Sequence, residues 1–117
     1  MKENIIADKS KAFAVRIIKL YKYLKDEKQE YVMSKQLLRS GTSIGANVRE
    51  AINAQSKKEF ISKMNISLKE ASETEYWLEL LVETDYLSQQ EFESIKKDCS
   101  EVLKITTAIL KSSNKQD

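Results

Sequence analysis

At 117 residues the chain has the length of a single domain, so we expect one hydrophobic core over residues 1–117, and its two glycines and lack of proline predict long helices rather than a β-rich fold. The sequence has no histidine and one cysteine, which excludes an internal disulfide, zinc or di-iron sites built on histidine, and Ser-His or Cys-His nucleophile pairs. The net charge is only +2, but residues 1–40 carry ten Lys or Arg against five Asp or Glu, so the N-terminal third is basic.

Two helices are predicted in the N-terminal half of the chain. Apolar residues recur at helical spacing and predict a helix over residues 8–25, with Asp8 or Ser10 as its N-cap. The apolar pattern is then lost in a short charged segment, which we expect to be a connection. A second helix is predicted over residues 30–54, where apolar residues again gather on one face.

The third and fourth helices are predicted from the same starting signal. Ser56 with Glu59, and Ser88 with Glu91, match the capping box, in which the serine accepts from a first-turn amide and the glutamate accepts from the cap amide. These starts predict helices over residues 57–84 and 89–112. Because the connections have only a few residues, neighbouring helices should run antiparallel, and we expect an all-α, up-down-up-down four-helix bundle.

The basic residues of the N-terminal third form a row that is a candidate nucleic-acid contact. They are Lys19, Lys22, Lys25, Lys28 and Lys35. Such a row fits the phosphates of RNA or an acidic protein. It equally fits the solvated face and exit of a helix, and both interpretations stay open.

The two glycines, Gly41 and Gly45, lie in "LLRSGTSIGANVREA", residues 37–51. Three residues separate them, and Ala-Asn follows, whereas a phosphate-binding P-loop needs four residues between its glycines and then Gly-Lys-Ser/Thr. On a helix both glycines share a face with the apolar residues. Since each glycine costs about 1 kcal/mol in a helix interior, two of them indicate that another helix packs closely at that turn.

The opposite side of the same helix is also unusual. Arg39, Ser43, Asn47 and Glu50 form a stripe of mostly small or hydrogen-bonding residues, and we expect Ser43 and Asn47 to be half-buried. On the third helix, apolar side chains point away from the predicted core: Ile66, Tyr76, Trp77 and Leu80. Exposed apolar surface of this kind favours self-association through these two helices, unless the bundle covers Trp77 with its own loops.

Glu75 lies at the edge of the predicted core face of the third helix. A carboxylate there needs a partner, because an unpaired buried charge costs several kcal/mol. Arg39 or Arg16 could provide it, and the expected role is a polar bridge that fixes helix register. Cys99 falls on the apolar face of the fourth helix, where we expect a buried, inert thiol.

Nothing in the sequence activates a nucleophile or assembles an acid-base pair, so we expect no enzyme, no catalytic residues, no metal and no cofactor. No apolar run approaches the roughly 20 residues needed to cross a bilayer, and no leader is recognisable. We therefore expect a cytoplasmic protein without a membrane contact.

Residues 35–83 resemble a known bacterial family. The stretch "LLRSGTSIGANVREA" is similar to the signature of the four-helix-bundle family first known from open reading frames in intervening sequences of 23S ribosomal RNA genes, and "SKKEFISKMNISLKEASETEYWL" is similar to its third helix. The resemblance implies a homopentamer, a ring with a central channel. It also implies kinship with the accessory variability protein of diversity-generating retroelements, which associates with a reverse transcriptase and with nucleic acid.

The resemblance also indicates which residues matter. Arg39, Ser43, Asn47 and Glu50 match the polar residues of the signature, and Glu75 matches an acidic position on the third helix. The complete set of candidate interface residues is Arg39, Gly41, Ser43, Gly45, Asn47, Glu50, Ile66, Glu75, Trp77 and Leu80. The predicted function is a non-enzymatic, RNA- or nucleoprotein-associated scaffold; the alternative is a protein-interaction adaptor that does not contact nucleic acid.

Overall fold

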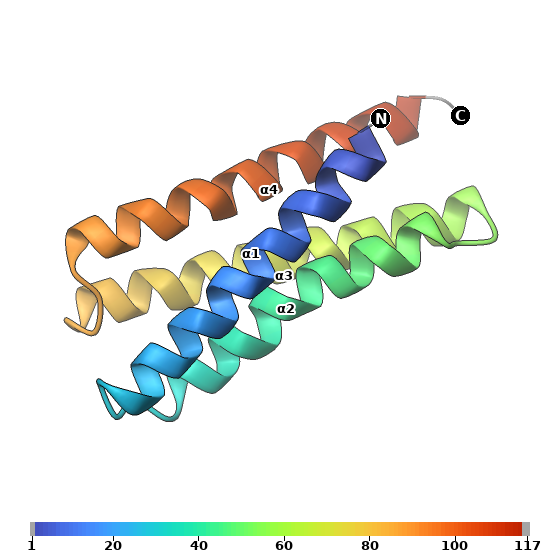
Figure 1. Cartoon of the computed structure of the whole chain (residues 1–117). Coiled ribbons are helices and arrows are strands. Elements are labelled where there is room, and N and C mark those ends of the chain that lie inside the picture. Colours follow the sequence, from blue (N-terminus) through green and yellow to red (C-terminus); the bar gives the residue numbers. More distant parts are fainter. Residues whose placement is uncertain (1, 116–117) are drawn as a thin grey trace.

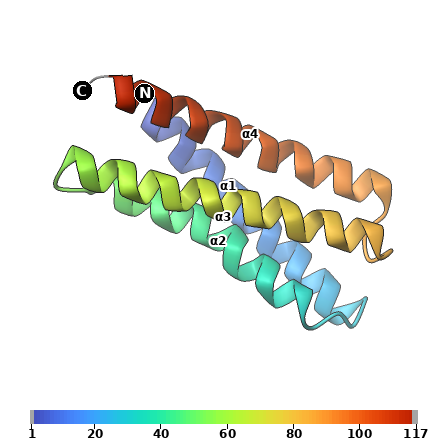
Figure 2. The ribbon, with the colours of Figure 1, turned by 180° about the vertical axis from the view of Figure 1, so that it is seen from behind.

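The computed structural model describes residues 2–115 and contains four α-helices (Figure 1). They are α1 (Lys2–Asp26), α2 (Met33–Ile52), α3 (Lys57–Glu83) and α4 (Gln89–Lys115). Each helix runs antiparallel to the one before it, and the molecule measures 48 × 21 × 19 Å (Figures 1 and 2). The predicted all-α, up-down-up-down bundle is confirmed.

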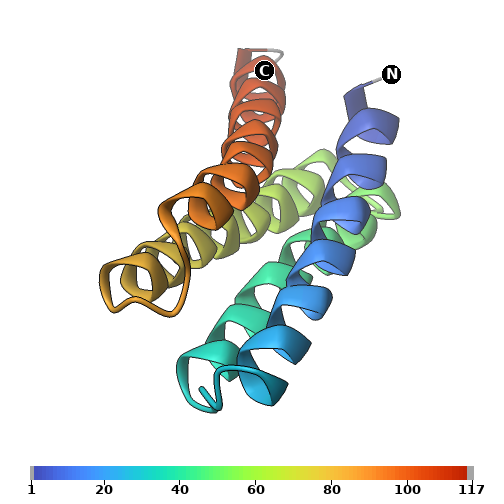
Figure 3. The ribbon, with the colours of Figure 1, turned by 60° about the vertical axis from the view of Figure 1, so that its left-hand side comes forward.

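The bundle is arranged around a square, with each helix packed on two others. α2 lies between α1 and α3, and α4 packs on α3 and α1 (Figure 3). The α1–α2 and α3–α4 connections lie at one end of the bundle, and the α2–α3 connection lies at the other (Figure 1). This topology decides which residues of different helices share a level along the bundle.

The core is built from apolar side chains at helical spacing, as the sequence predicted. The contribution of α4 was predicted most fully, since only Leu103 of its expected core residues is partly rather than fully buried; they are Phe92, Ile95, Cys99, Val102, Leu103, Thr106, Ile109 and Leu110. Large core side chains with less than 2% exposure come from all four helices: Ile6, Phe13, Ile17, Leu24, Leu37, Ile44, Val48, Met64, Leu78, Leu81 and Val102.

The first helix begins earlier than the pattern indicated. α1 starts at Lys2 rather than at residue 8, so neither Asp8 nor Ser10 is its N-cap. Ile6, with 1% exposure, extends the buried face by one more turn, which stabilises helix there without a cap signal. Ser10 is buried inside the helix, and its hydroxyl donates to the carbonyl of Ala7 at 3.3 Å.

The second helix begins at Met33 rather than at residue 30, because Glu30 caps it from outside. The Glu30 carboxylate accepts from the backbone N–H groups of Val32 (2.8 Å), Met33 (3.1 Å) and Ser34 (2.7 Å). The Ser34 hydroxyl donates back to the Glu30 carbonyl oxygen at 2.7 Å. The otherwise unpaired amides of the first turn are thus satisfied by one negative charge at the positive end of the helix.

The predicted capping boxes at α3 and α4 form, with one difference. Ser88 accepts from the Glu91 amide at 3.1 Å, and Glu91 accepts from the Ser88 amide at 2.8 Å. At α3, Ser56 accepts from the Glu59 amide at 3.0 Å, but the Glu59 carboxylate reaches one residue further back, to the amide of Gln55 at 3.0 Å.

Gly41 and Gly45 lie inside an unbroken α2 and face α1, as expected of glycines that admit a neighbouring helix. A methyl group at Gly41 would come within 2.7 Å of the Ile17 side chain. At Gly45 it would lie 3.4 Å from the Ser10 carbonyl oxygen, which is an ordinary contact. Both glycines therefore serve the packing of α2 on α1 within the chain; Gly41 is buried in this contact, whereas Gly45 is partly exposed at its edge.

Candidate assembly surface

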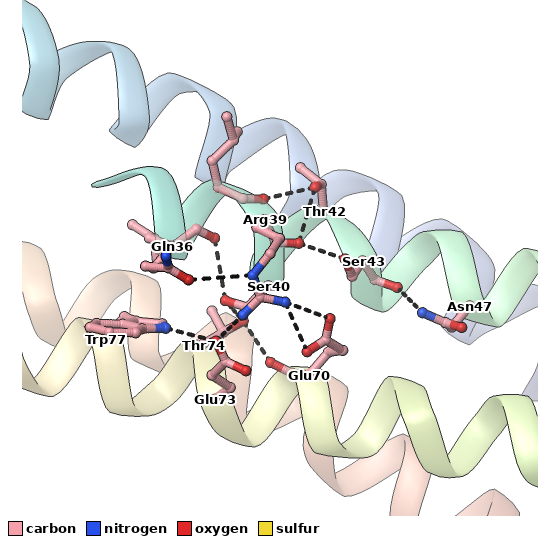
Figure 4. A network of polar contacts seen from close by, with 12 residues as sticks. Gln36, Arg39, Ser40, Thr42, Ser43, Asn47, Glu70, Glu73, Thr74 and Trp77 are labelled. Carbon is pink, nitrogen blue, oxygen red and sulfur yellow. Dashed lines mark hydrogen bonds and ion pairs between the residues drawn. The ribbon is translucent and has the colours of Figure 1, made fainter. Parts of the chain in front are cut away.

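Most of the candidate interface residues lie together on the outer side of α2 and α3. On α2 they follow the helical stripe Gln36, Arg39, Ser43, Asn47, Glu50, and on α3 they follow the stripe Lys63, Ile66, Glu70, Glu73, Trp77, Leu80. Contacts between the stripes join them into one surface (Figure 4). We call these eleven residues the α2/α3 surface.

Arg39 is the centre of the contacts between the two stripes. Its guanidinium donates to Glu70 at 3.2 Å and also pairs with Glu73, while its Nε donates to Gln36 at 3.4 Å. The Glu73 carboxylate also accepts from the indole N–H of Trp77 at 3.0 Å (Figure 4). One arginine thus fixes two carboxylates, and through one of them the orientation of the tryptophan ring.

Ser43 and Asn47 are half-buried, as predicted, and are satisfied within their own helix. Ser43 donates to the Arg39 carbonyl at 2.6 Å, and the Asn47 amide donates to the Ser43 carbonyl at 2.8 Å (Figure 4). Further along, Glu50 pairs with Lys63 at 3.0 Å. Ser43 and Asn47 are short, so the α2 stripe has no long side chain between Arg39 and the Glu50–Lys63 pair. This part of the surface is polar and stands out little from the helix.

Beneath this surface, small hydroxyl groups join α2 to α3, which the sequence analysis did not predict. Thr74 donates to the Ser40 hydroxyl at 2.9 Å, and Ser67 donates to the Ile44 carbonyl at 3.0 Å. All three hydroxyl side chains are completely buried. The sequence did contain a signal for these contacts: Ser40, Ser67 and Thr74 fall at helical spacing on the core-facing sides of their helices. Small polar residues in such positions indicate two helices that pack closely.

Apolar side chains stand out from the same side of the molecule. Ile66 is 39% exposed and Tyr76 54% exposed, while Trp77 and Leu80 are half-buried. Tyr76 and Trp77 contact each other edge to face, with ring centroids 5.4 Å apart. No loop of the described chain covers Ile66 or Tyr76, and Trp77 is only partly covered.

Glu75 lies on a different side of α3, and the partners expected for it were wrong. Arg39 pairs with Glu70 and Glu73, and Arg16 pairs with Asp98 at 2.8 Å. Glu75 instead faces α4, close enough to act on Cys99. Burial, and secondly the negative charge of Glu75, raise the pKa of the Cys99 thiol to about 12. Cys99 is therefore a protonated, buried thiol, as the sequence indicated.

The five candidate nucleic-acid-binding lysines surround the end of the bundle where α1 passes into α2. Lys19 and Lys22 are exposed on α1, Lys28 lies in the connection, and Lys35 is exposed in the first turn of α2. Lys25 lies 5.5 Å from the centre of the Tyr21 ring, and the Lys28 ammonium lies 5.9 Å from the centre of the Tyr23 ring. Lys25 and Lys28 therefore each cover one face of a tyrosine ring.

A groove runs between α1 and α2 on the side next to the α2/α3 surface, and the sequence analysis missed it. It has a volume of about 550 Å³. Small residues from both helices line it, including Ala7, Ala14, Thr42 and Ala46, with the cations Lys11 and Arg49 at its edge. The feature of the sequence that could have revealed the groove is the pair of alanines, Ala7 and Ala14, seven residues apart on one side of α1.

Within residues 2–115 no group of three or more His, Cys, Asp or Glu side chains is placed to hold a metal ion. Over the same residues, none of the helices has the length and apolar character needed to span a membrane.

The fold is an all-α four-helix bundle, and its α2/α3 surface carries both polar and apolar side chains. The comparisons with known proteins agree with this fold. The chain belongs to the 23S rRNA-intervening sequence protein family, whose model matches residues 2–108. A solved structure, a protein of unknown function from the S23 ribosomal protein family of Bacteroides thetaiotaomicron, is 59% identical to it, with a TM-score of 0.94. The match covers 95% of this chain and 99% of that one. No curated protein matches the chain.

Proposed function

We propose that this chain is a non-enzymatic subunit of a cytoplasmic homo-oligomer, a pentamer, that serves as an RNA- or nucleoprotein-associated accessory scaffold. The observation that carries the RNA part is the cluster of five lysines around the α1–α2 end of the bundle. The observation that supports assembly is the exposed apolar side chains on the outer side of α3, among them Ile66 and Tyr76.

The lysines suit phosphates better than bases. Two of the nearby aromatic faces, those of Tyr21 and Tyr23, are each covered by a lysine and are not free to stack on a base. Recognition would therefore depend on charge and be independent of sequence. In a ring, each subunit repeats the cluster, so several weak contacts act together on one RNA strand.

A gel-shift titration with a short single-stranded RNA of mixed sequence tests this proposal. Lys19→Gln, Lys22→Gln and Lys28→Gln together should weaken binding and lower the slope of log affinity against log salt by about 0.7 per lysine. The matched control changes Lys97, Lys104 and Lys111, exposed lysines on α4, and should leave the affinity nearly unchanged.

Three outcomes contradict the proposal. Absence of any shift at low salt rejects the RNA contact, and equal losses in the two triple variants reject its location. A wild-type mass of one chain in light scattering rejects the oligomer.

A protein-interaction adaptor is the second candidate, and one observation favours it. Tyr31 and Val32, in the α1–α2 connection, are 54% and 74% exposed. Exposed apolar residues at a loop tip suit docking to another protein. Co-purification of one protein partner from the host, lost on Tyr31→Ser with Val32→Ser and insensitive to nuclease, would favour this candidate over the scaffold.

A further inference from the structure

We infer that the oligomer is built by a contact between two different surfaces, in which the outer ridge of α3 in one copy docks into the α1/α2 groove of the next. This inference rests on the proposed self-association. The ridge consists of Ile66, Glu73, Tyr76 and Leu80. The groove is lined by Ala7, Lys11 and Ala14 on α1 and by Thr42, Gly45, Ala46, Arg49, Glu50, Ile52 and Asn53 on and just after α2. The same helical stripes extend it past Ile18, Tyr21 and Lys25 on α1 and past Lys35 and Leu38 on α2.

The two surfaces complement each other in shape. The groove is open because Ala14, Thr42 and Ala46 leave its volume of about 550 Å³ unfilled. The ridge carries large side chains, of which Ile66 and Tyr76 are 39% and 54% exposed. Ile18 and Ile52, at 38% and 41%, add apolar surface to the groove side. Both surfaces thus expose apolar groups that a contact would bury.

The two surfaces also carry opposite charge. On the side of α3 that carries the ridge, Glu73 and Glu83 are acidic and Lys69 is basic. The groove carries four bases, Lys11, Lys25, Lys35 and Arg49, and one acid, Glu50. Contact between unlike surfaces brings acid against base, whereas contact of either surface with its own copy brings like charges together.

The residues of the ridge and of the groove also lie at matching positions along the long axis of the bundle. Ser40 bonds Thr74 and Gly41 packs on Ile17, so Ile18 and Leu38 lie near the level of Tyr76. Ser67 bonds the Ile44 carbonyl, which puts Ile66 near the level of Ala46.

A neighbour placed alongside with its axis parallel therefore brings Ile66 onto the part of the groove lined by Ala46, and Tyr76 onto its extension beside Ile18 and Leu38. Glu79 and Glu83 then come near the level of Lys25 and Lys35.

The position of the two surfaces determines the form of the assembly. The groove lies between α1 and α2 and the ridge lies on α3, so the two are on adjacent sides of the bundle, with α2 at the corner between α1 and α3 (Figure 3). A contact between unlike surfaces turns every copy in the same direction, and it closes into a ring when the turn between neighbours divides a full circle. In that ring α2 lies on the side nearest the axis, and Lys19, Lys22 and Lys28 stay outside the contact.

Mixing two interface variants tests the inference. Ala46→Glu places an acid in the groove but leaves the ridge intact, and Tyr76→Lys places a base on the ridge but leaves the groove intact. Both positions are exposed within a chain, so the helical circular dichroism of each variant should match that of the wild type. Each variant alone should sediment as a single chain. Their mixture should form a one-to-one dimer, because one intact groove and one intact ridge remain.

The control and the contrary outcomes are separate from those of the proposed function. Ala108→Glu, an exposed alanine on α4, should keep the wild-type mass. A monomeric wild type overturns the assembly itself. A wild-type oligomer whose variants keep its mass, or whose variants stay monomeric on mixing, leaves the assembly standing and overturns the contact between groove and ridge.

Discussion

Gly41 and Gly45 look equivalent in the sequence, but their surroundings differ. Ile17, which a methyl group at Gly41 would meet at 2.7 Å, is completely buried and has no space to move into. At Gly45 the nearest atoms are at 3.4 Å, which leaves room for the methyl group. The spacing of the glycines therefore predicted a close helix contact, but not which glycine is required for it.

Alanine substitution should separate the two glycines. Gly41→Ala should lower the free energy of unfolding by about 1–3 kcal/mol, the usual effect of overpacking a filled core. Gly45→Ala should leave it unchanged or raise it by up to about 1 kcal/mol, because alanine favours the helix. Urea unfolding at one fixed protein concentration measures both, and equal destabilisation of the two variants would contradict this assignment.

At the same scale, the polar residues show what the sequence could and could not indicate. Ser43 and Asn47 were placed correctly, because small polar residues on a stripe opposite the core identify a half-covered helix side. The Glu75 partner was wrong, since helical periodicity gives the direction of a side chain but not which arginine of another helix reaches it. The Ser40–Thr74 bond depends on the register between α2 and α3, which periodicity does not contain.

At the scale of the elements, helix starts with a local signal were predicted and the others were not. The serine boxes gave the start of α3 and of α4 to the residue. The start of α2 was three residues early, because Glu30 caps it from an irregular position that includes Gln29 at a positive φ of 55°. A carboxylate that accepts from three amides is a tertiary arrangement of the connection rather than a short motif.

Removal of this cap should be costly. Glu30 is 6% exposed and its charge is hydrogen-bonded by three amides, so Glu30→Ala should lower the free energy of unfolding by about 2 kcal/mol. Glu27→Ala, an exposed acid in the same connection, is the matched control and should change it by less than about 0.5 kcal/mol. Thermal unfolding of both variants decides the matter; similar midpoints would show that the Glu30 bonds contribute little.

At the scale of the whole molecule, charge is divided across the bundle. The acidic residues 70–95 and the basic residues 11–39 lie at the same end but on different helices (Figure 1). The net charge of +2 conceals this division, which appears only when the topology places the segments side by side. Composition could therefore indicate that one third of the chain is basic. It could not indicate that an acidic segment lies next to that third, at the same end of the folded bundle.

The buried hydroxyl contacts between α2 and α3 also have a consequence for folding. A slide of one helix along the other would break the Ser40–Thr74 and Ser67–Ile44 bonds together, while Ser40 and Thr74 would keep only their bonds to the Leu37 and Glu70 carbonyls of their own helices. The α2–α3 hairpin should therefore open as one cooperative unit, and later than the rest of the bundle.

Hydrogen exchange of the native protein should then show the slowest amides in the middle of α2 and α3, with faster exchange in the first turns of α1 and the last turns of α4. Slowest exchange in α4 would contradict this order. On this view the α2–α3 hairpin is the stable folding unit of the chain, onto which α1 and α4 dock from either side.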